Sequence, residues 1–483
     1  MRFDCAQTAF DRGVPDHSSN GDEGRLPGFI GNYSKGLPHN LLGGVDPNAY
    51  QALLGAVNQG TFAAFEGVPM GGQRLLTNPL AGMAFDLEGP DSHALAVPPA
   101  PSFDSAAQAA DMAEVYWMAL LRDVRFTDYG IDPVVAAACQ DLGRFNEFQG
   151  VVPDTLFRGS TPGDRVGPYL SQFLWQDVPF GALTLGQRMR TLIPGVDFLT
   201  DFASWLGVQN GGPPAGAEVF DGTPRYIRNL RDMSQWVHVD ALYQAYLQSC
   251  LILLGLGVPT GPGNPYRTSR TQAGFGTFGG PHILSLVTEV ATRALKAIWY
   301  QKWFVHRRLR PEEFGGRVHL QRTGQAGYPI HPSLLSSPVL DRIFNRYGTF
   351  LLPMVFPEGC PTHPSYGAGH ATVAGACTTI LKAWFDESFV LPNPVVPDAD
   401  GLQLIPYAGP GAGQLTVGGE LNKVAANVAI GRNGAGVHYR TDYWESVRLG
   451  ERLAIGVLEE NKLTMAEDHF LRFTSFDGTL VTV

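Results

Sequence analysis

The sequence predicts a mainly α-helical protein, built from helical bundles in one large domain with long Gly- and Pro-rich loops and few short strands. Apolar residues recur at helical spacing in several long stretches, whereas alternation is confined to short pieces such as residues 414–417 and 479–483. The 58 glycines and 36 prolines favour irregular connections between helices. With 483 residues, 44% of them hydrophobic, the chain can bury a large core.

The organisation along the chain indicates a single domain, residues 1–483, because no low-complexity linker divides it. Residues 1–100 are rich in Gly, Pro and Asn and only weakly periodic, which predicts an extended wrap with short helices. We distinguish an N-terminal wrap with helices, residues 1–230, from a helical region, residues 231–483, that carries the candidate site.

Helical periodicity predicts the first long helices. One spans residues 105–123 and begins at Ser105, a favourable N-cap residue. A second spans residues 232–254. Residues 261–280 are predicted as a loop, although they contain a G-x-G-x-x-G string. No strand precedes this string and no acidic residue follows at the required distance, so it does not indicate dinucleotide binding.

Residues 283–309 form the most informative predicted helix. Its apolar stripe continues to Lys302, and Trp299 lies three residues earlier on the same face. Pro311, directly after Arg310, is expected to stop the helix. A single lysine on such a stripe usually reaches back to solvent. Two cations at the core-facing end of one helix instead indicate an anion between them.

A further predicted helix, residues 370–385, opens directly from the glycine-rich turn 366–369. The first N–H groups of a helix lack helical partners, so this turn is suited to binding an anion.

The next helix is expected to run from about residue 420 to 430 and to end at Gly431, with Arg432 just beyond it. We expect His438 to begin the following helix, with Asp442 one turn later on the same face. Asp442 could then accept a hydrogen bond from one ring nitrogen of His438.

The net charge of the chain, and the lack of membrane-spanning or signal-like stretches in the sequence, argue against several classes of protein. A net charge of −10 and a pI near 5.6 argue against nucleic acid or an anionic membrane as a partner. No apolar run reaches membrane-spanning length, and no secretory signal is visible. The location stays open: cytoplasmic by default, or exported if a leader was removed. The five cysteines are too scattered for a disulfide framework or a zinc ribbon, and a single bridge stays open.

Three basic and histidine-bearing clusters occur in the second half of the chain. They read YQKWFVHRRLRPE at residues 300–312, HPSYGAGH at residues 363–370 and GRNGAGVHYRTD at residues 431–442. Cations and backbone N–H groups stabilise the oxygens of a tetrahedral or trigonal-bipyramidal oxyanion, and imidazoles suit covalent or proton-transfer chemistry. We therefore expect the three clusters to form one oxyanion pocket.

The order of the clusters resembles that of a known superfamily. The spacing K-x7-R-P, then G-H, then R-x5-H-x3-D is similar to that shared by vanadium-dependent haloperoxidases and type-2 acid phosphatases. The likeness to the haloperoxidase branch, particularly to red-algal and cyanobacterial bromoperoxidases, extends along most of the chain. Outside the clusters it includes FIGNYSKGLPHN, VGPYLSQF, SLVTEVATRALKA and LGERLAIGVLEE. The resemblance implies two four-helix bundles in one large domain, with the anion in the C-terminal bundle.

The resemblance also implies a cofactor, vanadate (vanadium(V)), and no haem. It implies that His438 bonds to vanadium and that Asp442 orients the His438 ring. His370 would bind the apical oxygen and take up a proton when hydrogen peroxide binds, and Lys302 would polarise the peroxide. The residues implied around the vanadate oxygens are Lys302, Arg310, Ala368, Gly369, His370 and Arg432.

The implied activity is oxidation of halide by hydrogen peroxide to hypohalous acid or an equivalent species, which halogenates small organic acceptors. Bromide and iodide are favoured because His363 stands where bromoperoxidases carry a second histidine near the halide. Trp299 could shape halide access. Seen alone, His363 would be a surface or capping histidine and Trp299 a core residue. The relatives imply a homo-oligomer, a dimer or larger. Chloride, the organic acceptor and the oligomer number stay open.

Two departures from the family pattern stand out. Ala368 replaces a serine whose hydroxyl donates to an oxyanion oxygen, and one such bond is worth ~0.5–1.5 kcal/mol, about tenfold in affinity. Red-algal relatives carry a calcium site in the loop before the Lys302 helix. The corresponding loop here, YRTSRTQAGFGTF, has no carboxylate, so the sequence does not support calcium.

Other functions fit parts of the pattern. A phosphatase would use the same pocket, with His438 as nucleophile and His370 as acid. A non-enzymatic anion-binding or scaffold protein with a degraded site would be consistent with Ala368. A zinc site at His363 and His370 is disfavoured by the surrounding cations, and no G-x-S-x-G serine nucleophile is present.

Overall fold

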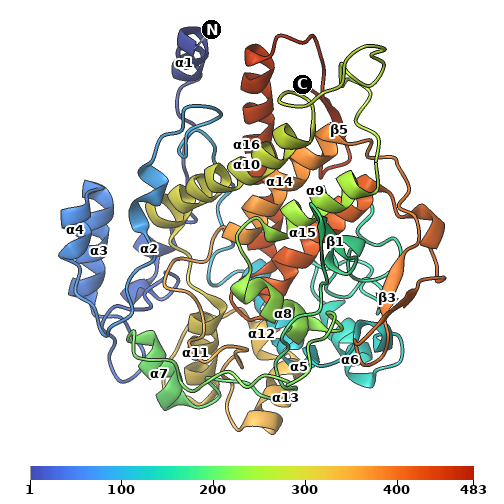
Figure 1. Cartoon of the computed structure of the whole chain (residues 1–483). Helices are drawn as coiled ribbons and strands as arrows, with labels where there is room; N and C mark the ends of the chain where they lie inside the picture. Colours follow the sequence, from blue (N-terminus) through green and yellow to red (C-terminus); the bar gives the residue numbers. More distant parts are fainter. Residues whose placement is uncertain (1) are drawn as a thin grey trace.

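Helices dominate the structure and its strands are short, which confirms the predicted fold class (Figure 1). The structure is a computed structural model that describes residues 2–483. The α-helices are α1 (Arg2–Arg12), α2 (Asp22–Arg25), α3 (Pro47–Gln59), α4 (Phe62–Glu66), α5 (Ala106–Leu121), α6 (Pro133–Leu142), α7 (Phe202–Gln209), α8 (Leu230–Val239), α9 (Gln244–Gly255), α10 (Gly280–Tyr300), α11 (Pro311–Arg322), α12 (Pro332–Leu335), α13 (Pro338–Tyr347), α14 (Gly369–Trp384), α15 (Val417–Gly434) and α16 (Arg440–Thr464).

Shorter elements connect these helices. The 3-10 helices are η1 (Pro27–Phe29), η2 (Pro79–Met83), η3 (Phe126–Asp128), η4 (Gln172–Leu174) and η6 (Ala412–Gln414), and η5 (Gln301–His306) is a π-helical turn. The strands form antiparallel pairs: β1 (Val178–Phe180) with β2 (Leu183–Leu185), β3 (Val395–Pro397) with β4 (Leu404–Pro406), and β5 (Arg472–Thr474) with β6 (Leu480–Thr482). None of the helices between residues 2 and 483 combines the length and apolar character needed to cross a membrane.

Helix α14 lies at the centre of a bundle with α10, α15 and α16 (Figure 1). Nearly every side chain of α14 is buried, so this helix is apolar and small-residue-rich all round. Glycines allow α14 and α16 to approach closely: a side chain at Gly375 would collide with Val447, and one at Gly450 would collide with Thr372. This bundle carries most of the predicted site residues.

A second group of helices gathers around α5, which contacts α6, α11, α12, α13 and α15. As predicted, Ser105 is the N-cap residue of α5, and its hydroxyl accepts a hydrogen bond from the Gln108 N–H at 3.1 Å. Most α5 side chains are fully buried, including Gln108 and Asp111, which face polar partners described below.

The N-terminal segment lies along α10, η5 and α11. Its apolar residues form a smaller core with Trp299, Trp303 and Tyr366. Polar contacts fasten it further: Lys35 forms a buried ion pair with Glu312 in α11 at 2.9 Å. The Trp299 indole N–H also donates to a backbone carbonyl of this segment, that of Thr77, at 3.2 Å.

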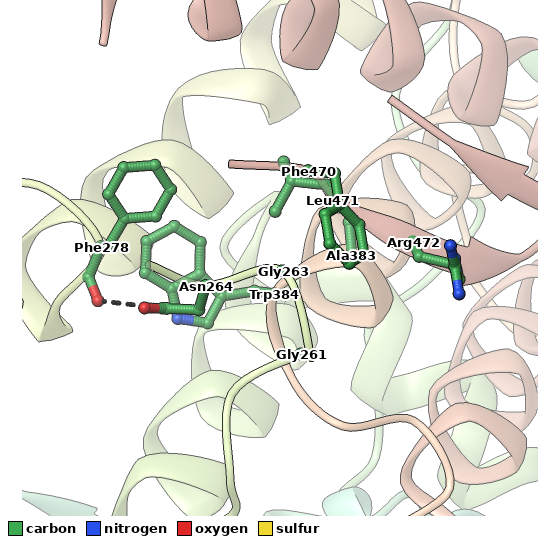
Figure 2. Close-up of a pocket in the computed structure, with 9 residues that line it drawn as sticks. All are labelled: Gly261, Gly263, Asn264, Phe278, Ala383, Trp384, Phe470, Leu471 and Arg472. Carbon is green, nitrogen blue, oxygen red and sulfur yellow. Dashed lines mark hydrogen bonds between the residues drawn. The ribbon is translucent and has the colours of Figure 1, made fainter. Parts of the chain in front are cut away.

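The β5–β6 hairpin closes the chain against the loop after α9 and the end of α14 (Figure 2). Gly261, Gly263 and Trp384 lie together with Phe470 here, and Asn264 donates to the carbonyl oxygen of Phe278 at 3.4 Å. A side chain at Gly263 would collide with Phe470, so the loop must be glycine at this point. Residues 261–279 form the predicted loop, which ends where α10 begins.

Two predicted helix boundaries are wrong. The helix expected over residues 232–254 is divided into α8 and α9, because Asp240 takes an extended conformation (φ −64°, ψ 149°) after α8. The helix expected over 283–309 ends at Tyr300 and continues only as the π-helical turn η5, followed by Arg307 in the left-handed region (φ 42°). Pro311 does not stop a helix but begins α11, where its fixed φ and missing N–H suit the first turn.

Boundaries in the last cluster also differ from the prediction. Helix α15 continues through Gly431 to Gly434 and so includes Arg432. Gly431 serves close packing rather than a helix end, because a side chain there would have little room beside Val237. His438 lies before α16 rather than in it. Residues 414–417 form the end of η6 and the start of α15 rather than a strand, whereas β6 lies within the predicted strand 479–483.

Candidate active site

The cations of the first cluster contact the backbone of residues 363–365, ahead of α14. Lys302, on the π-helical turn, is fully buried and donates to the carbonyl oxygens of Pro364 at 2.8 Å and Ser365 at 2.9 Å. Its ammonium also lies 5.5 Å from the centre of the Trp299 ring. A lysine that reaches inward to carbonyls does not extend to solvent, so Lys302 does not adopt the solvent-reaching arrangement that is usual for a lone lysine on an apolar stripe.

Arg310 connects the second cluster with the third. Its Nε donates to the backbone carbonyl of His363 at 2.9 Å, and its Nη2 lies 2.9 Å from the His363 Nδ1. Its Nη1 donates to the carbonyl of Val437 at 2.7 Å and lies 3.1 Å from the His438 Nε2. This fully buried guanidinium therefore brings both predicted histidines to one point.

His438 is fixed from its other ring nitrogen. Its Nδ1 lies 2.8 Å from the Asp442 Oδ2, as predicted, although Asp442 reaches it as part of the α16 capping turn. Ser365 donates to the same carboxylate oxygen at 2.5 Å, and Arg308 donates to the Asp442 Oδ1 at 2.8 Å. Since an ionised carboxylate only accepts, the Nδ1 of His438 carries the proton and the Nε2 keeps its lone pair.

Arg432 approaches the pocket from the last turn of α15. Its Nη1 donates to the carbonyl of Val237 at 2.9 Å, whereas its buried Nε has no partner. Burial and the neighbouring charge of Arg310 lower the pKa of Arg432 to about 10. An unpartnered N–H in a buried guanidinium is costly, so this group is suited to an anionic ligand.

The start of α14 supplies backbone donors and a partly exposed histidine. The N-cap position is Ala368, so no side chain caps the first turn of the helix. A side chain at Gly369 would approach the Trp299 ring at 3.1 Å, which keeps this position small. His370 is half-buried, and its Nε2 lies 2.9 Å from Asp240 Oδ1.

His363 and Trp299 lie against each other, with ring centres 4.6 Å apart. Both are buried, so the structure excludes the surface or capping interpretation of His363. The pair lies beside the two cations: Trp299 faces the Lys302 ammonium, and His363 contacts the Arg310 guanidinium.

The electrostatics of the pocket favour an added negative charge. Burial, followed by the charge of Arg310, lowers the pKa values of Lys302, His363 and His438 well below their usual values. Burial alone would raise the pKa of Asp442, but the charge of Arg308 and the hydrogen bond from His438 hold it well below its usual value. A buried oxyanion would relieve the mutual repulsion of Lys302, Arg310 and Arg432, so the donor set fits vanadate or phosphate.

Sequence reasoning missed four polar residues that support the site. Asp240 pairs with His370, Arg308 and Ser365 hold Asp442, and the Ser446 hydroxyl accepts from the Ala368 N–H at 2.8 Å. Arg308 and Ser365 lie inside the recognised clusters, so their position was a usable signal. Asp240 and Ser446 lie outside the clusters, in stretches without a local pattern.

Comparison with known proteins identifies the class. The family model described as the VCPO second helical-bundle domain matches residues 340–466. The chain is 38% identical to a vanadium-dependent bromoperoxidase of Corallina pilulifera over 100% of this chain and 97% of the relative. A vanadium-dependent bromoperoxidase of Ascophyllum nodosum is also 38% identical, over 93% of this chain and 86% of the relative.

A solved structure agrees with this result along the whole chain. The second vanadate-dependent bromoperoxidase from Ascophyllum nodosum, described as homohexameric, has a TM-score of 0.96 at 32% identity, covering 100% of this chain and 89% of the other. The chain therefore belongs to the vanadium-dependent haloperoxidases, peroxidases that act on halides. Within this class its relatives are the bromoperoxidases, as the sequence resemblance implied.

Proposed function

We propose that this protein uses vanadate and hydrogen peroxide to oxidise halide, with bromide and iodide favoured, to hypohalous acid or an equivalent halogenating species. The observation that carries the proposal is the buried His438, whose Nδ1 is committed to Asp442 while its Nε2 faces the buried cation Arg310. The names of the relatives support the cofactor and the halide. Small organic molecules would be the acceptors.

Within this proposal, the Nε2 of His438 would hold vanadium, and the cofactor would supply Lewis-acid polarisation of peroxide. The cations Lys302, Arg310 and Arg432 would hold the oxygens, together with the Gly369 N–H at the uncapped start of α14. Lys302 would add a positive charge beside the bound peroxide. These residues come from the helical region 231–483, and we propose that residues 1–230 wrap it within a single domain.

His370 is proposed to be the residue that would accept a proton beside the oxyanion pocket. Its partial exposure gives it access to solvent, and Asp240, 2.9 Å away, holds the ring. Asp240 thus extends the set of residues implied by the resemblance.

The experiment that tests the proposal is halogenation by metal-free protein, with and without added vanadate, using iodide, bromide and chloride. Hydrolysis of phosphate esters is measured on the same sample. Vanadate-dependent bromination and iodination are expected. Rapid ester hydrolysis without any halogenation would instead support the phosphatase function.

Replacing His363 with alanine is expected to lower bromide turnover more than iodide turnover. The imidazole lies beside Arg310 and Trp299, where a halide would approach, and iodide is the halide that is more easily oxidised. Steady-state rates with both halides measure the change. His319→Ala is the control. His319 has the same 8% exposure as His363, but it lies in α11 and not in the segment before α14. Unchanged bromide turnover in His363→Ala would return this histidine to a packing role.

Replacing Ala368 with serine is expected to tighten vanadate binding by up to about tenfold, the worth of one neutral hydrogen bond. Because residue 368 is the N-cap of α14 and its backbone is extended (φ −86°, ψ 122°), the hydroxyl can also cap the helix, worth ~0.5–2 kcal/mol of stability. A vanadate titration and an unfolding curve separate the two effects. A more stable variant with unchanged vanadate affinity would show that serine only caps the helix.

The protein is also proposed to be a homo-oligomer. The Ascophyllum nodosum structure of the same fold is described as homohexameric, and it covers this chain completely. The number of subunits can be measured by light scattering.

A further inference from the structure

Arg308 is a buried arginine shared by two carboxylates behind the candidate vanadium ligand. Its Nη1 donates to the Asp442 Oδ1 at 2.8 Å, and its Nη2 lies 3.1 Å from the Asp111 Oδ2. Its Nη2 also donates to the Gln108 Oε1 at 2.5 Å, and its side chain is 1% exposed. The guanidinium carbon lies 4.0 Å from the centre of the Tyr439 ring, so the group is held on its face as well as its edges.

The backbone around Arg308 explains why it reaches this position. Arg307, in the left-handed region, ends the π-helical turn and reverses the chain. The Arg308 carbonyl then accepts from the Ser365 N–H at 3.0 Å. The Ser365 hydroxyl in turn donates to Asp442, so Arg308 and Ser365 grip this carboxylate from both oxygens.

Both oxygens of Asp442 are therefore occupied in a fixed way. Oδ1 accepts from Arg308, and Oδ2 accepts from Ser365, from the Tyr439 N–H at 3.2 Å and from the His438 Nδ1. The carboxylate cannot turn about its own axis without losing the Arg308 bond. The orientation of the His438 ring, and the nitrogen that keeps its lone pair, thus depend on Arg308 through Asp442.

We propose that Arg308 is a positioning residue that fixes Asp442 so that the His438 ring keeps its orientation, with Nε2 aimed into the oxyanion pocket. This inference rests on the proposed function, in which Nε2 bonds to vanadium. The positioning role of Arg308 predicts different effects on the binding of vanadate and of phosphate. Vanadate needs both the cations and the Nε2 lone pair, whereas phosphate in the same pocket needs the cations only.

The test compares vanadate and inorganic phosphate binding to full-length, metal-free protein by equilibrium dialysis. Arg308→Gln is expected to weaken vanadate binding by roughly 10–100-fold, the usual effect of losing an outer-shell partner of a metal ligand. Phosphate binding should change far less, because Lys302, Arg310 and Arg432 are untouched. A general disturbance of the fold would weaken both anions alike.

Two further variants sharpen the result. Arg308→Lys keeps the charge but cannot hold Asp442 and Asp111 with one planar group, so an intermediate loss of vanadate preference is expected. If Arg308→Gln does not fold, the result with Arg308→Lys tests the positioning role. Arg440→Gln is the matched control. It removes another arginine at the start of α16, which pairs with Glu114 at 2.5 Å and does not contact His438 or Asp442.

The outcomes separate the inference from the proposed function. Wild-type protein that binds vanadate no more tightly than phosphate would contradict the proposed function itself. If the wild type prefers vanadate, an equal loss of both anions in the Arg308 variants would overturn the positioning role. Wild-type vanadate preference in both Arg308 variants would overturn it as well, as would an equal loss of preference in Arg440→Gln.

Discussion

Replacing His438 with alanine is expected to abolish halide oxidation and the tight binding of vanadate. His438 is buried, its Nδ1 is committed to Asp442, and its Nε2 is the nitrogen that faces Arg310 and the other cations. The loss in vanadate affinity should exceed the roughly 10–100-fold cost of removing an outer-shell partner. Equilibrium dialysis with vanadate and a bromination assay measure both effects.

Phosphate binding provides the internal control for His438→Ala. Lys302, Arg310 and Arg432 remain, and removing an imidazole whose pKa is already lowered by burial and by the charge of Arg310 takes away no cation at neutral pH. Phosphate should therefore bind almost as well as in the wild type. A variant that still brominates with vanadate would show that another group bonds to the metal.

Replacing Arg310 with glutamine is expected to weaken both vanadate and phosphate. This residue is the fully buried cation that contacts His363 and His438 together. Hydrogen bonds to charged groups contribute about 1.5–3 kcal/mol, so affinity for either anion should fall roughly 10- to 150-fold. Competition dialysis with the two anions, followed by bromination at saturating vanadate, measures the loss.

Arg317→Gln serves as the control for Arg310→Gln. Arg317 is a buried arginine within α11, the helix that follows Arg310, but it donates to the carbonyl of Gly43 at 2.6 Å and lies outside the pocket. Its replacement can cost stability without changing anion affinity. Selective loss of vanadate but not phosphate in Arg310→Gln would contradict a role on the oxygens.

Much of the candidate site is legible in the sequence because its residues cluster locally. Lys302 and Arg310 share one stretch, Gly369 and His370 another, and His438 and Asp442 a third, and the structure brings the three stretches together. Helices with strong periodicity, such as α5 and α14, were also predicted close to their observed ends. Features that depend on neighbouring residues along the chain can therefore be predicted from the sequence.

The remaining features depend on contacts between distant segments. The π-helical turn at Gln301–His306 interrupts an apolar stripe whose spacing predicts one continuous helix. No residue type in this stretch indicates the turn. Asp240 leaves the helical path to meet His370, which lies 130 residues away. Gly431 lies within α15 and not at its end, and its small size makes room for Val237. Tertiary packing overrides local propensity at each of these points.

The most direct test of the central claim is a vanadate titration of metal-free protein with bromination as the readout, repeated at several phosphate concentrations. One buried pocket should give activity that rises from background and saturates at one vanadium per chain. Phosphate should raise the vanadate concentration required without lowering the final rate, because both anions would occupy the same cations. Bromination that needs no vanadate, or that phosphate leaves unaffected, would contradict a shared oxyanion pocket at His438.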